Sequence, residues 1–422
     1  MRVAIVGAGY SGTLAAVEAK RARPDAEILL IEKSGRFARG AAYGTESPSH
    51  LLNVRARSMS AFADAPDHFA EWLAREGLGG AGDFARRRDY ARYIGGILDG
   101  AEVRRVADEA VAVEDGALAL ASGTRLAFDA LVLAGGNYPG RMPARLTVPA
   151  VDDPWSADGA EQVARLAAQG GDLLLMGTGL TMVDVALSLE DWGFAGRMVA
   201  VSRRGLVPRP HEEPPSPPLD DAPPPRLGAL VRHVRGLAPW RAAVDSLRPH
   251  TIDLWRGFSE AERRRFLRHL RPWWDVHRHR IAPPVAARIA ALREAGRLEV
   301  LAGRVRQEGA AIVVTLRGGG ERRGAFAGAI NCTGPEGAIG RVADPLVRQL
   351  IASGAARPDG LGLGLDVDDQ SRLVGADGAA SARLFAVGPP TRGAYWEVVA
   401  VPDIRRQVRG VAESLALLGE RD

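Results

Sequence analysis

Three glycines near the N-terminus have the spacing that lets a main chain approach a dinucleotide pyrophosphate. The apolar run Arg2–Val6 leads directly into Gly7-Ala-Gly9-Tyr10-Ser11-Gly12, and a helical stretch follows. The first glycine permits a tight turn, the second lets the backbone approach a phosphate, and the third lets the helix pack closely on the strand. The pattern predicts a strand–turn–helix unit whose helix N-terminus faces a pyrophosphate.

An acidic residue at the expected distance completes this unit. A second apolar run, Ile28–Ile31, ends at Glu32, 20 residues after Gly12. A carboxylate at this strand end accepts hydrogen bonds from the ribose hydroxyls of an adenosine half. We therefore expect a dinucleotide cofactor to be bound by Gly7, Gly9, Tyr10, Ser11, Gly12, Glu32 and Lys33.

A second fingerprint lies in the middle of the chain. The apolar run Asp172–Met176 precedes Gly177-Thr-Gly179-Leu-Thr181-Met182, in which methionine replaces the third glycine. The next predicted strand, Met198–Val201, ends in Ser202-Arg203-Arg204 instead of an acid. Arginines can pair with a 2′-phosphate, so NADPH is favoured and NADH is the alternative. The lesser alternative is that the two arginines belong to a solvated strand end, because all but two of the 55 basic residues are arginine.

The two halves repeat one another in outline. Each fingerprint is followed by short predicted strands and then by an apolar strand that ends in glycine, Leu131–Gly135 in the first half and Ala329–Gly334 in the second. Leu384–Gly388 is a further strand of this kind, and a helix from about Pro402 to Leu418 follows it. The duplication predicts an α/β protein with two Rossmann-like dinucleotide-binding domains, the second inserted in the first.

The expected domain boundaries follow from this repeat. Residues 1–150 and 326–422 would form the first dinucleotide-binding domain, and 151–205 with 286–325 the second. Residues 206–285 would form an insertion, which opens with seven prolines between 214 and 225, typical of an extended polyproline-like loop. Ser259 with Glu262 predicts a capping box for a helix that ends at Arg271-Pro272.

The insertion is rich in arginine, with eight arginines against three acids between residues 256 and 280. One interpretation is a helical cap whose arginines are solvated. Another is a lid in which Arg278, His277 or His279 contacts an anionic group. Nucleic-acid binding is the weakest interpretation, because the 51 acidic residues are spread along the whole chain.

Composition limits the remaining possibilities. A chain of 422 residues suggests two or three domains. No apolar run reaches the ~20 residues that span a bilayer, so we expect a cytoplasmic protein without a membrane partner. Cys332 is the single cysteine, which excludes an intramolecular dithiol relay and makes a structural metal site implausible. The oligomeric state is left open.

The motifs resemble those of the two-dinucleotide-binding flavoprotein superfamily, which includes the N-hydroxylating and Baeyer–Villiger-type monooxygenases. More narrowly, the chain resembles a group of bacterial FAD/NAD(P)-binding proteins. The segments that carry this narrower resemblance are Gly40–Gly44, His50–Val54, Ser202–Gly205, Arg271–Arg280, Asn331–Pro335 and Arg392–Glu397. Arg55 departs from the pattern, since a proline is expected near this position, and this puts the shape of the loop in doubt.

The resemblance implies two cofactors and their contacts. FAD would bind the first fingerprint and Glu32, with Asn53, Gly135 and Gly388 lining it. NADPH would bind Gly177, Gly179, Thr181, Ser202, Arg203 and Arg204. The start of the last helix would face the pyrimidine edge of the flavin, where reduction builds up negative charge.

The expected chemistry is reduction of the flavin by NAD(P)H. Without a dithiol, reduced flavin can pass its electrons to oxygen, which leads to hydroxylation of a small molecule. The alternatives are a reductase that serves an electron-carrier protein or a quinone-like acceptor, and a redox sensor without catalysis. Arg392, Glu397 and His50 are the candidate catalytic residues, although Arg392 and Glu397 would equally fit a local ion pair that fixes the loop.

Overall fold

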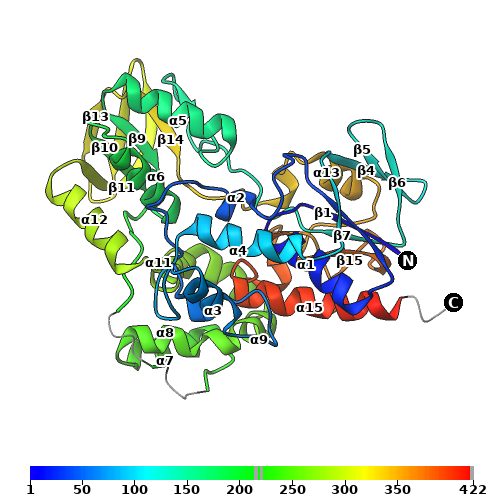
Figure 1. Ribbon diagram of the computed structural model, residues 1–422. Coiled ribbons are helices and arrows are strands. Elements are labelled where there is room, and N and C mark those ends of the chain that lie inside the picture. The colour runs from blue at the N-terminus through cyan, green and yellow to red at the C-terminus, as the bar shows by residue number, and fades with distance from the viewer. Residues whose placement is uncertain (213–216, 219–221, 419–422) are drawn as a thin grey trace.

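The computed structural model describes residues 1–212, 217–218 and 222–418. Its two large sheets lie in separate lobes, and a group of helices from the middle of the chain lies beside both of them (Figure 1). Part of the proline-rich segment 214–225 lies outside the described residues. In the described part of the chain, no helix is both long and apolar enough to cross a membrane.

The first sheet has six strands in the order β15-β16-β7-β1-β2-β3. Its strands are β1 (Arg2–Val6), β2 (Glu27–Ile31), β3 (Arg104–Val106), β7 (Ala130–Leu133), β15 (Arg372–Val374) and β16 (Ala380–Ala386). All pairs are parallel except β15 with β16. Helix α1 (Tyr10–Ala22) packs against the last long helix, α15 (Val401–Leu417). The C-terminal segment thus completes the sheet that the N-terminus begins.

The second sheet has seven strands in the order β13-β12-β11-β10-β9-β14-β8. Its strands are β8 (Ala150–Val151), β9 (Leu173–Met176), β10 (Met198–Ser202), β11 (Leu298–Glu308), β12 (Ala311–Leu316), β13 (Glu321–Gly324) and β14 (Gly328–Asn331). The associated helices are α5 (Ala157–Gln169), α6 (Leu180–Asp191) and α12 (Pro283–Glu294). Strands β8, β9, β10, β11 and β14 pair in parallel, as the continuous apolar runs predict.

The internal repeat is visible in the topology. The order β3-β2-β1-β7 of the first sheet has its counterpart in β11-β10-β9-β14 of the second. In the first half, the meander β4 (Ala110–Glu114), β5 (Ala117–Leu120) and β6 (Arg125–Ala127) forms a small separate sheet, whereas β12 and β13 extend the large one. The predicted fold class, α/β with two Rossmann-like domains, is confirmed.

One predicted boundary is wrong. We predicted that the first domain resumes at residue 326, which would place β14 in the first sheet. In the structure, β14 pairs with β9 in the second sheet. The physical reason is the repeat itself, since β14 occupies the position that β7 has beside β1. The chain returns to the first sheet only after Asn331. Strand β8, at residue 150, likewise lies at the edge of the second sheet.

The insertion is helical, as expected. It contains α7 (Leu227–Gly236), α8 (Trp240–Ser246), α9 (Thr251–Gly257), α10 (Glu260–Arg265) and α11 (Arg271–Arg278). The capping box of Ser259 and Glu262 is confirmed. The predicted helix end at Arg271-Pro272 is wrong: a π-helical turn, Phe266–Leu270, leads directly into α11. Pro272 is tolerated because it lies in the first turn, where a missing N–H removes no helical hydrogen bond.

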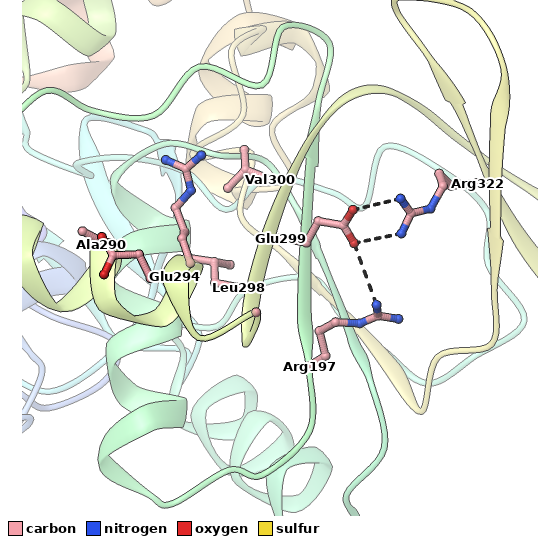
Figure 2. A pocket seen from close by; sticks show the side chains of 9 residues that line it. Arg197, Ala290, Glu294, Leu298, Glu299, Val300 and Arg322 are labelled. Atoms are coloured by element: carbon pink, nitrogen blue, oxygen red, sulfur yellow. Dashed lines mark hydrogen bonds and ion pairs between the residues drawn. The ribbon is translucent and has the colours of Figure 1, made fainter.

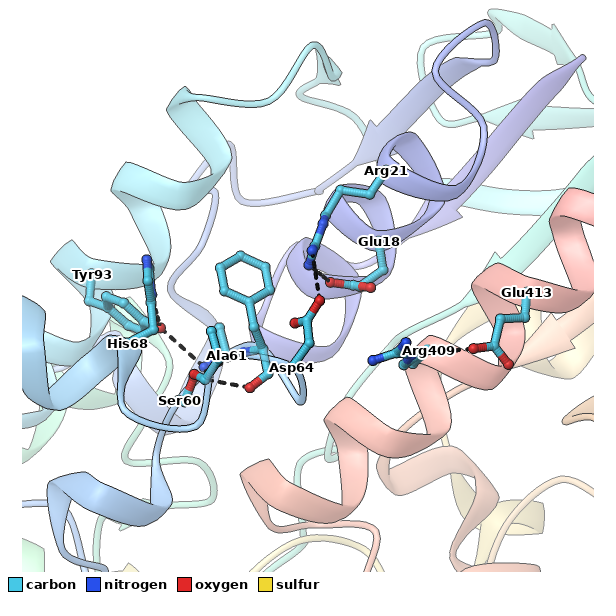
Figure 3. A network of polar contacts seen from close by, with 11 residues as sticks. Glu18, Arg21, Ser60, Ala61, Asp64, His68, Tyr93, Arg409 and Glu413 are labelled. Atoms are coloured by element: carbon cyan, nitrogen blue, oxygen red, sulfur yellow. Dashed lines mark hydrogen bonds and ion pairs between the residues drawn. The ribbon is translucent and has the colours of Figure 1, made fainter.

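Polar contacts tie together the helices that cover the first sheet. Figure 3 shows Arg21 of α1 bridging Glu18 and Asp64, with Nη–carboxylate distances of 2.7 and 3.0 Å. Nearby, the Tyr93 hydroxyl of α4 (Arg87–Asp99) accepts from the Ala61 amide at 3.1 Å. It also lies 2.8 Å from Nδ1 of His68, the first residue of α3 (His68–Arg75). The loop that precedes α3 is therefore fixed at both ends.

Candidate functional site

The first fingerprint turn has the geometry that its glycines predict. Gly7 has a φ of +97°, and a Cβ there would lie 2.5 Å from the Ala134 oxygen at the end of β7. A Cβ at Gly12 would lie 1.7 Å from the Gly7 oxygen, so α1 can follow β1 this closely only with glycine. The first amides of α1 consequently remain available at the turn, the arrangement that a pyrophosphate requires.

Glu32 lies at the end of β2 and reaches back to this turn. Its Oε2 accepts a hydrogen bond from the Ala8 amide at 2.9 Å. Its Oε1 accepts from the Ser34 hydroxyl at 2.8 Å, a hydrogen bond of the kind that a ribose hydroxyl would donate. The carboxylate therefore lies at the first turn, and its contact with a ribose stays a prediction. Lys33 points elsewhere, because its ammonium pairs with Glu109 at 3.3 Å.

A short segment covers the turn from outside. Gly40, at the start of α2 (Gly40–Tyr43), has a φ of +59°, and a Cβ there would lie 2.9 Å from the Gly9 Cα. The ring of Tyr43 packs between Tyr10 and Tyr90, with centroids 6.3 and 4.7 Å away. The buried Tyr10 hydroxyl has no hydrogen-bond partner among the described residues. Burial raises the pKa of Tyr10 well above its usual value, so the hydroxyl is neutral.

The C-terminal strand reaches the same turn. Gly388 follows β16 with a φ of +73°, and a Cβ there would lie 2.5 Å from the Ser11 Oγ. Its amide donates to Gln407 of α15 at 2.8 Å. At the neighbouring strand end, a Cβ at Gly135 would lie 2.8 Å from the Tyr138 hydroxyl. Three strand ends thus meet around α1, and the cradle fits a flavin dinucleotide.

The second fingerprint repeats these contacts on the other sheet. Gly177 has a φ of +120°, and a Cβ there would lie 2.2 Å from the Cys332 oxygen at the end of β14, the counterpart of Ala134. Gly179 borders open space, since a Cβ there would meet no atom within 4 Å. The turn therefore has room for a phosphate. Met182, which replaces the third glycine, lies in the first turn of α6 and is fully buried.

Ser202, Arg203 and Arg204, which the sequence predicts to contact the adenosine half of NADPH, lie at the end of β10. The Ser202 hydroxyl lies 2.8 Å from the Thr178 hydroxyl and accepts from the Gly205 amide at 3.0 Å, so it shapes the turn. Arg203 is exposed and Arg204 is half-buried. In the described part of the chain, neither guanidinium has an ion-pair partner, which leaves both available for a phosphate.

A cavity of about 280 Å³ lies between the two fingerprints. The first domain contributes Tyr43, Leu52, Asn53 and Tyr138, and the second contributes Leu180, Thr181, Asp184 and Asn331. Val399, just before α15, also lines it. The cavity is the place where the reactive rings of two cofactors, each bound at its own fingerprint, could meet.

Contacts around this cavity join the domains. Arg87 of α4 and Asp184 of α6 form a buried ion pair at 2.8 Å. His50 is also buried here, and its Nδ1 lies 2.8 Å from the Thr45 hydroxyl. Its Nε2 lies 3.0 Å from both the main-chain oxygen of Asp184 and the Ser188 hydroxyl. Burial lowers the pKa of His50 below its ordinary value. With both ring nitrogens engaged, His50 has the environment of a domain-joining residue.

Arg392 and Glu397 lie in and after the short helix α14 (Arg392–Tyr395), but they do not pair with each other. The Arg392 guanidinium lies 4.5 Å above the ring of Trp396. The Glu397 carboxylate accepts from the Trp274 indole at 2.8 Å and lies 3.4 Å from the Arg278 Nε. Arg278 therefore contacts an internal carboxylate in this structure, where the lid interpretation expected an external anion.

The electrostatics of this cluster keep it charged. Burial alone would raise the pKa of Glu397, but His279 and Arg278 outweigh burial and the pKa lies below its usual range. Burial and neighbouring Arg271 lower the pKa of Arg392 to about 10, so it stays cationic at neutral pH. The cluster joins the insertion to the strand end at Gly388.

Several residues of the site were not predicted individually. Gly40 and Tyr43 lie within a segment that carries the family resemblance, which was the available signal, but their contact with the first turn depends on the tertiary structure. Arg87 and Asp184 gave no local signal. Arg55, the departure from the expected proline, stacks on Phe84 with its guanidinium carbon 4.7 Å from the ring centroid.

A larger groove of about 660 Å³ lies at the opposite end of the second sheet. Figure 2 shows Glu299 there between Arg322 and Arg197, with ion-pair distances of 3.1 and 4.0 Å. Arg197 and Glu299 lie where β10 and β11 begin, whereas ligands of open α/β sheets bind beyond the carboxyl ends of the strands. The groove is therefore separate from the candidate site.

Comparison with known proteins agrees with this geometry. A family model described as FAD-NAD(P)-binding matches residues 4–138, which include the first fingerprint, Glu32, Asn53 and Gly135. No curated protein matches the sequence. The predicted class of FAD- and NAD(P)-binding protein is thus supported by sequence as well as by fold.

Solved structures match the chain from end to end. Ornithine hydroxylase from Pseudomonas aeruginosa has a TM-score of 0.64 at 17% identity, covering 99% of both chains. L-lysine 6-monooxygenase from Pseudomonas syringae has 0.65 at 16%, again covering 99% of both. Ornithine N-hydroxylase from Kutzneria sp. 744, solved with reduced FAD, NADP⁺ and L-ornithine, has 0.66 at 13%, covering 98% of both. The fold of the protein is that of the two-dinucleotide-binding flavoproteins.

Proposed function

We propose that the protein is an FAD-dependent oxidoreductase that uses NADPH to reduce the flavin and hydroxylates a small molecule. The observation that supports this most directly is the cavity of about 280 Å³ that both dinucleotide folds line. One fingerprint would hold FAD and the other NADPH. Transfer of electrons between two bound cofactors requires that their reactive rings meet, and this cavity lies between the two turns.

Bound flavin would supply the redox chemistry, and the chain would supply binding and orientation. The Gly7–Gly12 turn and the start of α1 would hold the FAD pyrophosphate, and Glu32 the ribose. Gly177 and Gly179 would hold the nicotinamide pyrophosphate, with Arg203 and Arg204 on the 2′-phosphate. Tyr43, Tyr138 and Trp155 line the cavity and would restrict water around the reacting atoms.

Hydroxylation is favoured over a thiol relay by the chain itself. Cys332, its single cysteine, is buried, and burial raises its pKa far above the usual range. Such a thiol is a poor nucleophile. The structures that match over nearly the whole chain include three amino-acid hydroxylating enzymes, which makes oxygen the favoured electron acceptor.

Two measurements on the purified holoprotein test the proposal. Under anaerobic conditions, NADPH should bleach the visible absorbance of bound flavin stoichiometrically, and absence of bleaching would exclude any NADPH-driven activity. On admission of oxygen, a hydroxylase should consume oxygen and NADPH together, and release of peroxide should fall when its substrate is added. Rapid electron transfer to a quinone together with slow reaction with oxygen would instead identify a reductase.

A further inference from the structure

The helical insertion borders a further cavity, of about 540 Å³, that opens to the surface and that neither fingerprint reaches. We call it the apolar cavity. It lies among α7, α8, α9, the π-helical turn and α11 in the lower part of Figure 1, with Trp396 from the C-terminal segment. Its volume falls within the range of about 300–1,000 Å³ typical of small-molecule sites.

Aromatic and aliphatic side chains dominate the lining of this cavity. Five of the eight tryptophans of the chain border it, and Leu227, Leu230, Phe258 and Phe266 add to the apolar surface. The five are Trp240, Trp255, Trp273, Trp274 and Trp396. Trp273 is 45% exposed, an unusual exposure for so large an apolar side chain. Such a wall favours a ligand that is itself apolar.

Trp396 connects the apolar cavity with the cofactor site. Its ring stacks on Trp255 with centroids 4.8 Å apart, and the Arg392 guanidinium lies above the same ring. Its φ of +47° is strained for a residue with a side chain, so packing holds it in place. Three residues later, Val399 lines the interdomain cavity. One short segment thus borders both cavities.

The apolar cavity offers no partner to a cationic ligand, because the ionisable residues that line it, Arg235 and His277, are basic. The Trp274 indole is already bonded to Glu397, and the His277 Nδ1 lies 2.7 Å from the Trp273 oxygen. No acidic residue of the described part of the chain lines the cavity, so an ammonium group there would lack a carboxylate partner. An unpaired charge in apolar surroundings is strongly disfavoured. An amino acid such as ornithine, with charges of both signs, would fit poorly.

We propose that the apolar cavity binds a mainly apolar small molecule that carries no cationic group, and that this is the substrate class of the enzyme. The second part rests on the proposed function, because only a flavin-dependent reaction gives the ligand a role as substrate. The ligand would occupy the space between Leu230, Trp255 and Trp396, close to the segment that leads to the cofactor cavity.

Binding can be measured on the FAD-loaded protein with N-phenyl-1-naphthylamine, an uncharged fluorescent probe, and with 1-decanol as competitor. Val231→Trp and Val234→Trp would each fill part of the apolar cavity from α7 and should weaken probe binding at least tenfold. Leu417→Trp, at a position 57% exposed at the end of α15, is the matched control and should leave it unchanged. Flavin content and thermal unfolding of each variant verify folding.

The outcomes separate the two proposals. Probe binding that is equal in the filled variants and the control would overturn the ligand site, whether or not NADPH reduces the flavin. Stimulation of NADPH oxidation by L-ornithine or L-lysine, but not by 1-decanol or the probe, would overturn the apolar substrate class. Loss of probe binding in the filled variants, together with no anaerobic bleaching in the wild type, would refute the proposed function and leave a binding site.

Discussion

At the scale of single residues, Arg203 and Arg204 combine a charge unpaired in the described part of the chain with a position at the carboxyl end of the second sheet. Many arginines described in the structure have a carboxylate nearby, as Arg197 has Asp172 at 2.9 Å. Arg203 and Arg204 have no such partner among the described residues, and they follow β10 at the carboxyl end of the second sheet. A 2′-phosphate placed there would gain charge-assisted hydrogen bonds without breaking existing ones.

We expect Arg203→Ala and Arg204→Ala to raise the KM for NADPH about 10- to 100-fold each, since a hydrogen bond to a charged group contributes about 1.5–3 kcal/mol. The KM for NADH should change little. Arg293→Ala is the matched control, because Arg293 is an exposed arginine of the same domain that lines the groove at the opposite end of the sheet. Steady-state kinetics with both cofactors provide the measurement. Equal effects on NADPH and NADH would contradict recognition of the 2′-phosphate.

A second residue-scale prediction concerns pH. Burial lowers the pKa of His211 to about 4, and its Nε2 lies 2.9 Å from the Asn53 oxygen. Because the folded pKa lies below the ordinary value, the stabilisation is complete above about pH 6.5 and is lost as the pH falls toward 4. From pH 7 to pH 5, the wild type should lose about 2 kcal/mol more unfolding free energy than His211→Gln. Urea unfolding at both pH values tests this, and parallel losses in the two proteins would refute it.

At the scale of elements, the contact between a strand end and the first turn of a helix determines the shape of each fingerprint. In both fingerprints, a glycine with positive φ lies against the backbone of a neighbouring strand end, Gly7 against Ala134 and Gly177 against Cys332. Gly388 adds a third such approach, to Ser11 of α1. These contacts set how closely strands and helix surround the place of the cofactor.

Gly388→Ala should reduce the FAD content of the purified protein and lower its unfolding free energy by about 1–3 kcal/mol. The new Cβ would lie 2.5 Å from the Ser11 Oγ at a residue with a φ of +73°. Gly410→Ala is the control: Gly410 lies in α15 with no atom near its would-be Cβ, so this change should raise stability by up to about 1 kcal/mol. Flavin absorbance and chemical unfolding measure both effects. Full flavin content in Gly388→Ala would show that this close approach is unnecessary.

At the scale of the whole molecule, the two domains are joined by buried polar contacts across the interdomain cavity. The Arg87–Asp184 pair has side-chain exposures of only 14% and 8%, and His50 reaches α6 beside it. Further out, Arg288 bridges Glu190 and Asp191, each at 2.6 Å, and its Nη1 donates to the Ser49 hydroxyl. These contacts fix the distance between the two fingerprints.

Arg87→Ala should lower the unfolding free energy by about 3 kcal/mol, because Asp184 would stay buried without its partner. The rate of anaerobic flavin reduction by NADPH should fall by a larger factor than the FAD content of the purified protein, since the domains would no longer be held together. Arg92→Ala, on the same helix, removes an exposed pair with Glu76 and should cost less than about 1 kcal/mol. Stopped-flow absorbance and urea unfolding provide the readouts. Normal reduction in a folded Arg87→Ala protein would argue against a positioning role for this pair.

The sequence by itself determined the strand–turn–helix units and their duplication. Gly7, Gly12 and Gly177 could be read from spacing alone, because a tight turn and a close helix approach are local demands of the backbone. The capping box at Ser259 was also local. Glu32 was predicted from its distance along the chain, since β2 has a fixed place beside β1.

Only the tertiary structure decided which distant groups meet. It assigned β14 to the second sheet, because pairing depends on the neighbouring strand and not on a nearby sequence boundary. It placed Glu397 beside Arg278, and His50 beside α6. Both contacts join segments that are more than 100 residues apart in the sequence. It also formed the apolar cavity around Trp396, since the shape of a cavity arises from helices packed together and no single helix encodes it.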